Sequence, residues 1–351
     1  MKIVFIAHGA SNGGAGRVSS ILCNELARKG HQVTYYAFHY SNVSYPIDPA
    51  VNYVILHQKS GNRILTLLYR NRAIYEYIKK SRPDLVISFA ANIMSYTVMK
   101  WKGPVIYSLR NDPSSVNAGM IGKRIRDRLY RRAKAIVFQT PGARDYFPEE
   151  IRRKGVIIGN PIREDLPCWR LDQAEDVIMT ACRLDSQKNV SLLLKAFRLV
   201  HEKHPSWSLR ICGDGPLMEQ LKKESAELGI SDRVEFMGFC DNINELMVRS
   251  SIFALSSDFE GLSNSMLEAL ATGLPTVCTD CSPGGAALYI QNGVNGFLTP
   301  VGNHVAFAEA LCRLIEDRSL RAAVSSEAVK IRERLSTEQI VSEWDAVISK
   351  N

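Results

Sequence analysis

Short apolar runs alternate with polar loops and helical segments along the whole chain. An apolar run at residues 2–7 is followed by a glycine-rich turn, a stretch of helical periodicity that ends at Gly30, and a β-rich run at 31–38. This order predicts a strand–helix–strand unit in a parallel sheet, because such crossovers are right-handed. Similar apolar runs recur at 84–90, 104–110 and 135–140. The first half is therefore predicted to be a doubly wound α/β domain.

A second strand–helix series follows a polar, proline-containing segment at residues 163–176, which we interpret as an inter-domain linker. Its predicted strands lie at 176–184, 207–213, 233–239, 251–257, 275–280 and 296–300. Its predicted helices lie at 191–204, 216–229, 265–273 and 306–318. We expect two Rossmann-like domains, at 1–163 and 164–336, which face each other across a ligand cleft.

Composition and charge narrow the function classes. The chain has 351 residues and a formal net charge of +8, which favours an anionic partner. No apolar run is long enough to span a membrane, and the N-terminus has too few apolar residues for a secretory signal, so we expect a cytoplasmic protein. The eight cysteines are scattered, and the C-x-x-C of Cys278 and Cys281 lacks the partners of a zinc site. We expect no bound metal.

The glycine-rich turn at residues 11–17 contains Gly13 and Gly14 directly before a helix. Backbone amides in such a turn can bind a phosphate. The spacing does not match a dinucleotide fingerprint or a P-loop. The turn therefore predicts either a phosphate contact or a plain tight turn.

Two cations lie at the carboxyl end of the first predicted strand of the second domain. Arg183 lies in the last residues of that strand, and Lys188 lies just before the next helix. Positive side chains at a strand end beside a helix N-terminus suit a diphosphate. The alternative is that both are solvated loop residues.

Two acids, Glu260 and Glu268, flank the predicted start of a helix near Ser263 or Asn264, whose side chains can cap it. A helix N-terminus carries partial positive charge and free amides, so it can bind an anion. A phosphate there would place a ribose near Glu268 and a sugar near Glu260. The alternative is that both acids only flank the start of the helix and bind no ligand.

Taken together, the glycine turn, CRLDSQKN, the GDGP turn at 213–216, the VEFMGF strand and GLSNSMLEALATGLP resemble retaining glycosyltransferases of family 4, with the GT-B fold. The resemblance covers nearly the whole chain. It implies a nucleotide-sugar donor and no divalent metal. It also implies that the chain returns to the first domain through a final helix at about 337–351, whose apolar stripe is Ile340, Val341, Trp344 and Val347.

The resemblance implies a role for each matching position. Glu268 would bind ribose hydroxyls, and Glu260 would hold the donor sugar near the developing oxocarbenium ion. The diphosphate would be bound by Gly13, Gly14, Arg183, Lys188, Leu262, Ser263 and Asn264, and the nucleobase by Gly213, Phe239 and Cys240.

One position departs from the family pattern. Many relatives carry a histidine or a Glu-His pair at the end of the strand at 104–110, whereas this chain has Arg110, Asn111 and Asp112 there. An arginine cannot act as a base at neutral pH. We therefore expect Arg110 to steady a phosphate or a donor hydroxyl, and we count it with Glu260 among the catalytic candidates.

Two basic amphipathic segments, at residues 62–83 and 121–135, suit an anionic membrane surface. The second contains Lys123, Arg124, Arg126, Arg128, Arg131 and Arg132. The alternative is a solvated helix face. Neither segment belongs to a nucleic-acid reader fold, so we expect no nucleic acid.

The sequence thus predicts a peripheral glycosyltransferase on the inner face of the cell membrane. It would transfer a sugar, with a UDP-sugar favoured, to a lipid-linked or growing glycan in the synthesis of O-antigen, capsule or exopolysaccharide. Two alternatives stay open: a GT-B enzyme with a soluble small acceptor, and an epimerase-type or non-catalytic GT-B protein that binds nucleotide without transfer.

Overall fold

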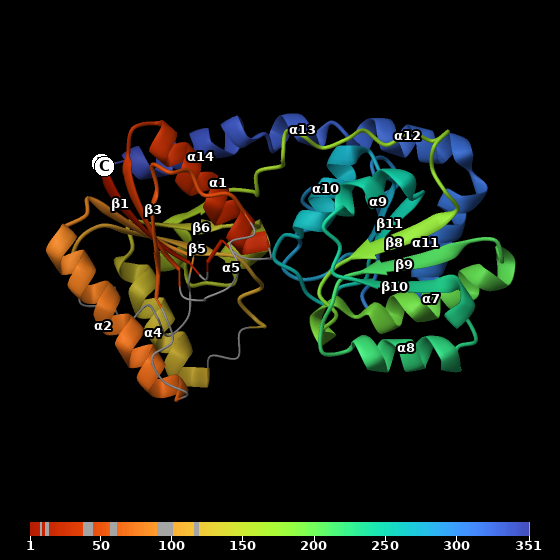
Figure 1. The fold of residues 1–351 in the computed structure, drawn as a ribbon, viewed down its shortest axis with the longest axis horizontal. Helices are drawn as coiled ribbons and strands as arrows, with labels where there is room; N and C mark the ends of the chain where they lie inside the picture. The colour runs from red at the N-terminus through yellow and green to blue at the C-terminus, as the bar shows by residue number, and fades with distance from the viewer. Residues whose placement is uncertain are drawn as a thin grey trace. The chain divides into compact units, whose positions relative to one another are not determined.

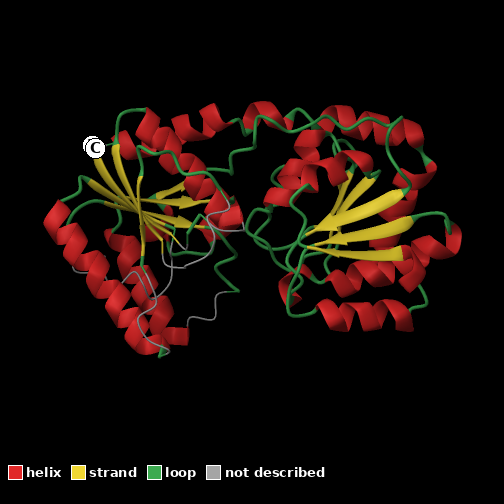
Figure 2. Cartoon of the chain, viewed as in Figure 1, coloured by secondary structure: helices red, strands yellow, loops and turns green. Residues whose placement is uncertain are grey.

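The computed structural model describes residues 1–7, 9–10, 14–37, 45–56, 62–89, 101–115 and 119–350. The chain forms two compact units. The N-terminal unit comprises Met1–Pro161 and Thr337–Asn351, and the C-terminal unit comprises Ile162–Ser336. Each unit is a sheet between helices (Figures 1 and 2). The predicted boundary after residue 163 falls just inside the C-terminal unit.

The N-terminal sheet has the strand order β3-β2-β1-β4-β5-β6-β7, and all its neighbouring strands are parallel. Its strands are β1 (Lys2–Ala7), β2 (Gln32–Ala37), β3 (Asn52–Ile55), β4 (Leu85–Ser88), β5 (Val105–Leu109), β6 (Ala135–Phe138) and β7 (Gly155–Ile157). The edge strands β3 and β7 have no counterpart among the predicted strands, since they are only four and three residues long and their side chains are exposed or half-buried.

Helices cover both faces of this sheet (Figure 1). On one face lie α1 (Gly14–Arg28) and α14 (Thr337–Ser349), and on the other α2 (Arg63–Ser81) and α4 (Gly119–Arg132). Two short helices, α5 (Pro141–Asp145) and α6 (Glu149–Arg152), follow β6. On the α2 and α4 face, buried residues of both helices, among them Ile78 and Tyr130, pack on strand residues such as Ile6 and form one apolar core.

The C-terminal helix α14 is held within the N-terminal unit. Its apolar stripe is buried, and the Trp344 ring lies 5.8 Å from the ring of Phe89. Two polar contacts join its surface to the unit: an ion pair between Lys29 and Asp345, and a hydrogen bond of 2.8 Å from Lys134 Nζ to the Ile348 carbonyl.

The C-terminal sheet has the order β10-β9-β8-β11-β12-β13 and is again parallel. Its strands are β8 (Val177–Ala181), β9 (Ser208–Cys212), β10 (Val234–Gly238), β11 (Ile252–Leu255), β12 (Thr276–Thr279) and β13 (Phe297–Thr299). Its helices are α7 (Val190–Lys203), α8 (Met218–Glu227), α9 (Ile243–Arg249), α10 (Asn264–Thr272), α11 (His304–Glu316), α12 (Arg318–Ala328) and α13 (Ile331–Arg334). Residues of α7 and α11, such as Phe197 and Leu311, fill its main core.

Residues 163–176, which the sequence predicts to be the inter-domain linker, pack on the C-terminal unit. Leu166 and Trp169 are buried, and Trp169 Nε1 donates to the Ser250 carbonyl at 2.7 Å. Arg332 donates to the carbonyls of Leu166 and Pro167 at 3.1 and 3.0 Å. The few apolar residues of this polar segment thus attach it to the C-terminal unit.

Replacing Trp344 with Ala should destabilise the N-terminal unit by about 3–5 kcal/mol, because the indole is fully buried and its removal leaves a cavity. Urea unfolding followed by circular dichroism measures the effect. Val301→Ala, at a side chain that is 42% exposed, is the control and should change little. Wild-type stability of the Trp344→Ala variant would show that α14 is dispensable.

Candidate active site

The site is built around an ion pair at the centre of the C-terminal sheet. Neighbouring strands β8 and β11 lie where the strand order reverses, with β9 beyond one and β12 beyond the other. In open α/β sheets, such a switch point at the carboxyl ends of the strands is where ligands bind. The loop after β8 carries Lys188 and the loop after β11 carries Glu260, and their side chains form an ion pair.

This ion pair is largely shielded from water, since the side chains of Lys188 and Glu260 are 14% and 16% exposed. Burial alone would lower the pKa of Lys188, but the charge of Glu260 and the hydrogen bond to it raise that pKa above its usual value. Lys188 is therefore protonated at neutral pH. It is a fixed positive charge at the carboxyl edge of the sheet.

Hydrogen bonds join the two loops that carry the pair. Asn189 Nδ2 donates to Asp258 Oδ1 at 2.7 Å, and the Asp258 amide donates to the Gln187 carbonyl at 2.9 Å. Ser256 Oγ donates to the Lys188 carbonyl at 3.1 Å. Asn189 has a left-handed backbone with φ of 40° and caps α7. These contacts fix the position of Lys188 and Glu260 before any ligand binds.

The helix α10 begins beside this pair. Its first residue is Asn264, and Ser263 caps it by accepting a hydrogen bond from the Met266 amide at 3.4 Å. The predicted start of this helix is therefore confirmed. Leu262 and Ser263 are buried, and Glu268 lies in the second turn with a half-buried side chain.

The GDGP turn after β9 packs directly on the loop after β8. A Cβ at Gly213, whose φ is 137°, would lie 1.8 Å from the Cys182 carbonyl oxygen, so no larger residue fits there. Phe239 and Cys240 follow the next strand, β10, and the Phe239 side chain is 61% exposed. All three candidate nucleobase residues thus lie at the same edge of the sheet as Lys188.

The structure does not bring Arg183 to the ion pair. Its side chain is 73% exposed, and its Nε lies 3.7 Å from Asp185 Oδ2 on the same loop. Of the predicted diphosphate cations, Lys188 is therefore the one that the structure places against Glu260.

In the N-terminal unit, Gly14 begins α1 after the carboxyl end of β1, and Gly13 lies outside the described residues. Arg110 follows β5. Its Nη2 donates to Asn160 Oδ1 at 2.6 Å, and its guanidinium lies 4.7 Å from the Phe89 ring centre. Burial lowers the pKa of Arg110 to about 9, so the side chain still carries its charge at neutral pH.

Fewer cations of the helix α4 are exposed to solvent than the sequence predicts. Arg126 is only 6% exposed, lies 4.6 Å from the Phe147 ring centre and pairs with Asp127 at 3.0 Å, so its assignment to a membrane-facing surface is wrong. Arg124, Arg128, Arg131 and Arg132 are exposed and Lys123 is half-buried. Arg131 pairs with Glu150 at 2.8 Å.

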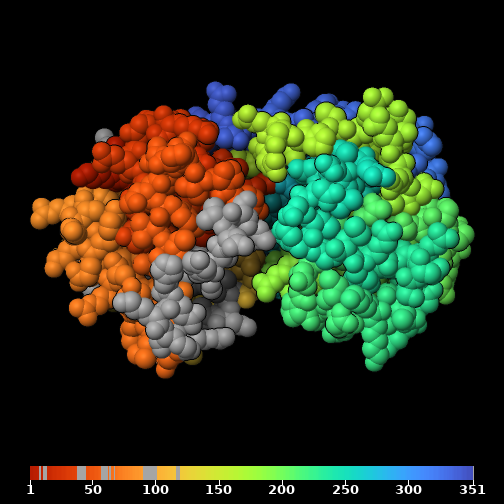
Figure 3. Space-filling model, viewed as in Figure 1, coloured from red at the N-terminus to blue at the C-terminus, as the bar shows by residue number. Residues whose placement is uncertain are grey.

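Apolar side chains lie exposed near the N-terminal ends of α4 and α2. Met120 and Ile121 are 76% and 75% exposed, and Leu65 and Leu68 are 56% and 61% exposed. The helix α2 lies at the surface of its unit, where it is coloured orange in Figure 3. None of the described helices has both the length and the apolar character needed to cross a membrane.

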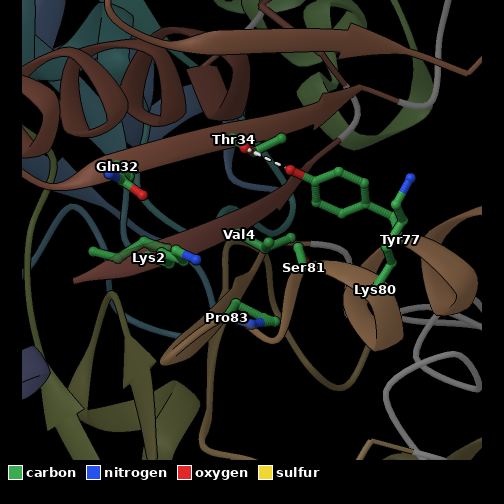
Figure 4. Close-up of a pocket in the computed structure, with 9 residues that line it drawn as sticks. Lys2, Val4, Gln32, Thr34, Tyr77, Lys80, Ser81 and Pro83 are labelled. Carbon is green, nitrogen blue, oxygen red and sulfur yellow. Dashed lines mark hydrogen bonds between the residues drawn. The ribbon is translucent and has the colours of Figure 1, made fainter.

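Neither of two other polar features lies at the carboxyl edges of the sheets. Within the described part of the chain, His204, Cys312 and Glu316 each place one possible ligand atom within 4.8 Å of the others, but His204 is the C-cap of α7, at the helix end away from Lys188. A cavity of about 420 Å³ lies at the amino ends of β1 and β2, where Thr34 and Tyr77 share a hydrogen bond of 3.0 Å (Figure 4).

The chain has two doubly wound α/β units, and one of them has an ion pair at its switch point. Together with the comparison to protein families, this architecture defines a glycosyltransferase of the GT-B fold. The model for Glycosyltransferase Family 4 matches residues 12–166, and the model for Glycosyl transferases group 1 matches residues 162–331. The chain therefore belongs to the family 4 glycosyltransferases, and the predicted family and fold are confirmed.

Similar proteins come from bacterial glycan synthesis. The amylovoran biosynthesis glycosyltransferase AmsD of Erwinia amylovora is 25% identical over 362 residues, covering 99% of both chains. The Campylobacter jejuni GalNAc-alpha-(1->4)-GalNAc-alpha-(1->3)-diNAcBac-PP-undecaprenol alpha-1,4-N-acetyl-D-galactosaminyltransferase is 24% identical and covers 100% of this chain and 99% of its own. The crystal structure of Anabaena HepE in complex with UDP and glucose has a TM-score of 0.82 at 20% identity, covering 99% of both chains.

Breaking the Lys188–Glu260 pair should cost stability. Lys188→Met or Glu260→Gln alone should each cost about 2–4 kcal/mol, because each leaves a shielded charge without its partner. The double variant should cost less than the sum of the two. Urea unfolding of all four proteins gives the coupling energy.

The matched control is the surface pair Arg153 and Glu149, whose side chains are 76% and 64% exposed. Its coupling should be about 0.5 kcal/mol or less. Additive effects of Lys188→Met and Glu260→Gln would contradict a pre-formed, energetically coupled pair.

Proposed function

We propose that this glycosyltransferase transfers a sugar, with retention of anomeric configuration, from a nucleotide diphosphate sugar to a lipid-linked glycan in the synthesis of a cell-surface polysaccharide. The observation that carries the proposal is the Lys188–Glu260 pair at the switch point of the C-terminal sheet, next to the start of α10. A cation, a carboxylate and a helix N-terminus together suit a diphosphate joined to a sugar.

Each part of the donor then has a residue of matching chemistry. The diphosphate would bind Lys188 and the backbone around Leu262, Ser263 and Asn264, and exposed Arg183 would turn toward it from Asp185. Glu268 would accept hydrogen bonds from the ribose, and the base would lie near Gly213, Phe239 and Cys240. A UDP-sugar is favoured, since the structurally similar Anabaena HepE is in complex with UDP and glucose.

The reaction needs no protein nucleophile in this proposal. The acceptor hydroxyl attacks the anomeric carbon on the face from which the diphosphate leaves. The bond from that carbon to the phosphate oxygen breaks, the new glycosidic bond forms, and the hydroxyl proton passes to the leaving phosphate. Lys188 and the N-terminus of α10 stabilise the charge on the leaving group, and Glu260 stabilises the positive charge on the sugar. No divalent metal takes part.

The acceptor assignment has two supports. The name of the Campylobacter relative includes a PP-undecaprenol-linked saccharide. The exposed cations of α4, next to exposed Met120 and Ile121, suit an anionic lipid surface. The protein would then act at the cytoplasmic face of the cell membrane.

The two glutamates should have separable kinetic roles. Glu260→Gln should lower kcat by roughly 10²–10³-fold, because charge stabilisation in the transition state is lost. Glu268→Gln should raise the donor KM about tenfold or more and change kcat less. The assay measures nucleotide release with acceptor present, and Glu227→Gln on exposed α8 is the control.

These assays should contain a chelator. Normal turnover by Glu260→Gln would remove Glu260 from the mechanism. Loss of wild-type activity on chelation, and its return with Mg²⁺, would contradict the proposal that no metal takes part.

Membrane binding should depend on three cations of α4, of which Arg124 and Arg128 are exposed and Lys123 is half-buried. The triple replacement Lys123→Gln, Arg124→Gln and Arg128→Gln should weaken binding to anionic vesicles roughly a hundredfold, because each cation near such a surface contributes about 1 kcal/mol. Vesicle co-sedimentation at low and high salt measures it. Lys222→Gln with Lys223→Gln, on α8, is the control, and equal partitioning of all proteins would exclude this surface.

A further inference from the structure

Arg110 is a charged side chain built into the carboxyl edge of the N-terminal sheet. It follows β5, where its guanidinium lies 4.7 Å from the Phe89 ring centre. Its Nη2 donates to Asn160 Oδ1 at 2.6 Å and its Nη1 to Ser108 Oγ at 3.4 Å. These contacts with an aromatic ring, an amide and a hydroxyl hold the group in place without neutralising it.

Within the described ranges, no carboxylate forms an ion pair with Arg110, and burial accounts for its lowered pKa without a charged neighbour. The residues outside those ranges include no Asp or Glu in the sequence. By contrast, buried Arg126 has Asp127 at 3.0 Å. The side chains that the structure describes therefore supply no partner charge to Arg110.

Asn160 is held by a second amide. Its Oδ1 also accepts from Gln139 Nε2 at 2.8 Å, and Gln139 follows β6 with only 3% of its surface exposed. Gln139 thus holds the Asn160 Oδ1 atom in place, and that atom holds Arg110. Among the described groups, Gln139 Oε1 has no hydrogen-bond partner, so this small cluster is incomplete.

A shielded cation without a counter-ion is costly, and charged groups perturbed in this way cluster at functional sites. A guanidinium has five N–H donors, and the contacts of Nη1 and Nη2 use two of them. Because Arg110 is half-buried rather than enclosed, an incoming group can reach it. Phosphates and carboxylates match its fork of donors.

We propose that Arg110 is an oxyanion subsite of the N-terminal unit, and that a substrate supplies its counter-charge. Gln139 and Asn160 are its positioning residues. The inference rests on the proposed function and adds one requirement to it: a substrate must carry an oxyanion that binds Arg110. The oxyanion is either a phosphate of a diphosphate substrate or the carboxylate of an acidic sugar.

Calorimetric titration of the full chain tests the subsite. The probes are UDP and farnesyl diphosphate for the phosphate source, and methyl glucuronide against neutral methyl glucoside for the carboxylate source. Arg110→Met should lower the affinity for the oxyanion that binds there at least tenfold, and Arg110→Lys should retain part of it. Arg153→Met, at an exposed arginine of the same unit, should change nothing.

The pattern of losses identifies the source. A lower affinity for UDP or farnesyl diphosphate assigns a phosphate. A lost preference for methyl glucuronide over methyl glucoside, with diphosphate binding unchanged, assigns a sugar carboxylate. Affinities of Arg110→Met equal to wild type for all these probes would overturn the subsite, while sugar transfer by the wild type would leave the proposed function standing. A wild type that binds none of the probes would overturn both the subsite and the preference for a UDP-sugar.

Stability separates a ligand-binding role from a structural one. Without ligand, Arg110→Met should melt at or above the wild-type temperature, because a shielded cation is removed. Gln139→Glu keeps the side-chain size but adds a carboxylate beside the cluster, so it should compete with the ligand and weaken oxyanion binding. A lower melting temperature for Arg110→Met, with unchanged oxyanion binding, would assign Arg110 a structural role and contradict the proposal.

Discussion

The ion pair between Lys188 and Glu260 is the interaction on which the candidate donor site depends. A lysine at a strand end beside a helix start is a common feature, and so is a glutamate before a helix. In this structure the side chains of Lys188 and Glu260 lie against each other at the switch point, so a fixed positive charge and a fixed negative charge are neighbours there. The loops that carry them are joined through Asn189 and Asp258, so the geometry exists before a donor arrives.

The parallel topology explains why residues far apart in the sequence meet there. Every strand in each sheet points the same way, so all the loops that follow strands emerge at one edge. Gly213, Phe239 and α10 reach the Lys188 edge for this reason, and Arg110, Gln139 and Asn160 share the corresponding edge of the N-terminal sheet. The cavity beside Thr34 and Tyr77 lies at the opposite edge, where strands begin.

The elements that a local pattern of residues encodes could be predicted from the sequence. Apolar runs located most strands, and Ser263 located the start of α10, but the prediction missed β3 and β7, which are short, half-buried edge strands. Arg126 was misassigned although it lies three and four residues before buried Leu129 and Tyr130, a spacing that marks the inner face of α4. The contact between Lys188 and Glu260, and the role of Gln139, depend on strand order, which one sequence without relatives does not reveal.

The most direct test of the central claim is a crystal structure of the enzyme with a non-hydrolysable nucleotide diphosphate sugar. The account predicts the diphosphate at the N-terminus of α10 within hydrogen-bonding distance of Lys188 Nζ, the ribose on Glu268, and the sugar facing Glu260. A donor bound elsewhere, or one bound at this edge with its phosphates away from both Lys188 and α10, would contradict it.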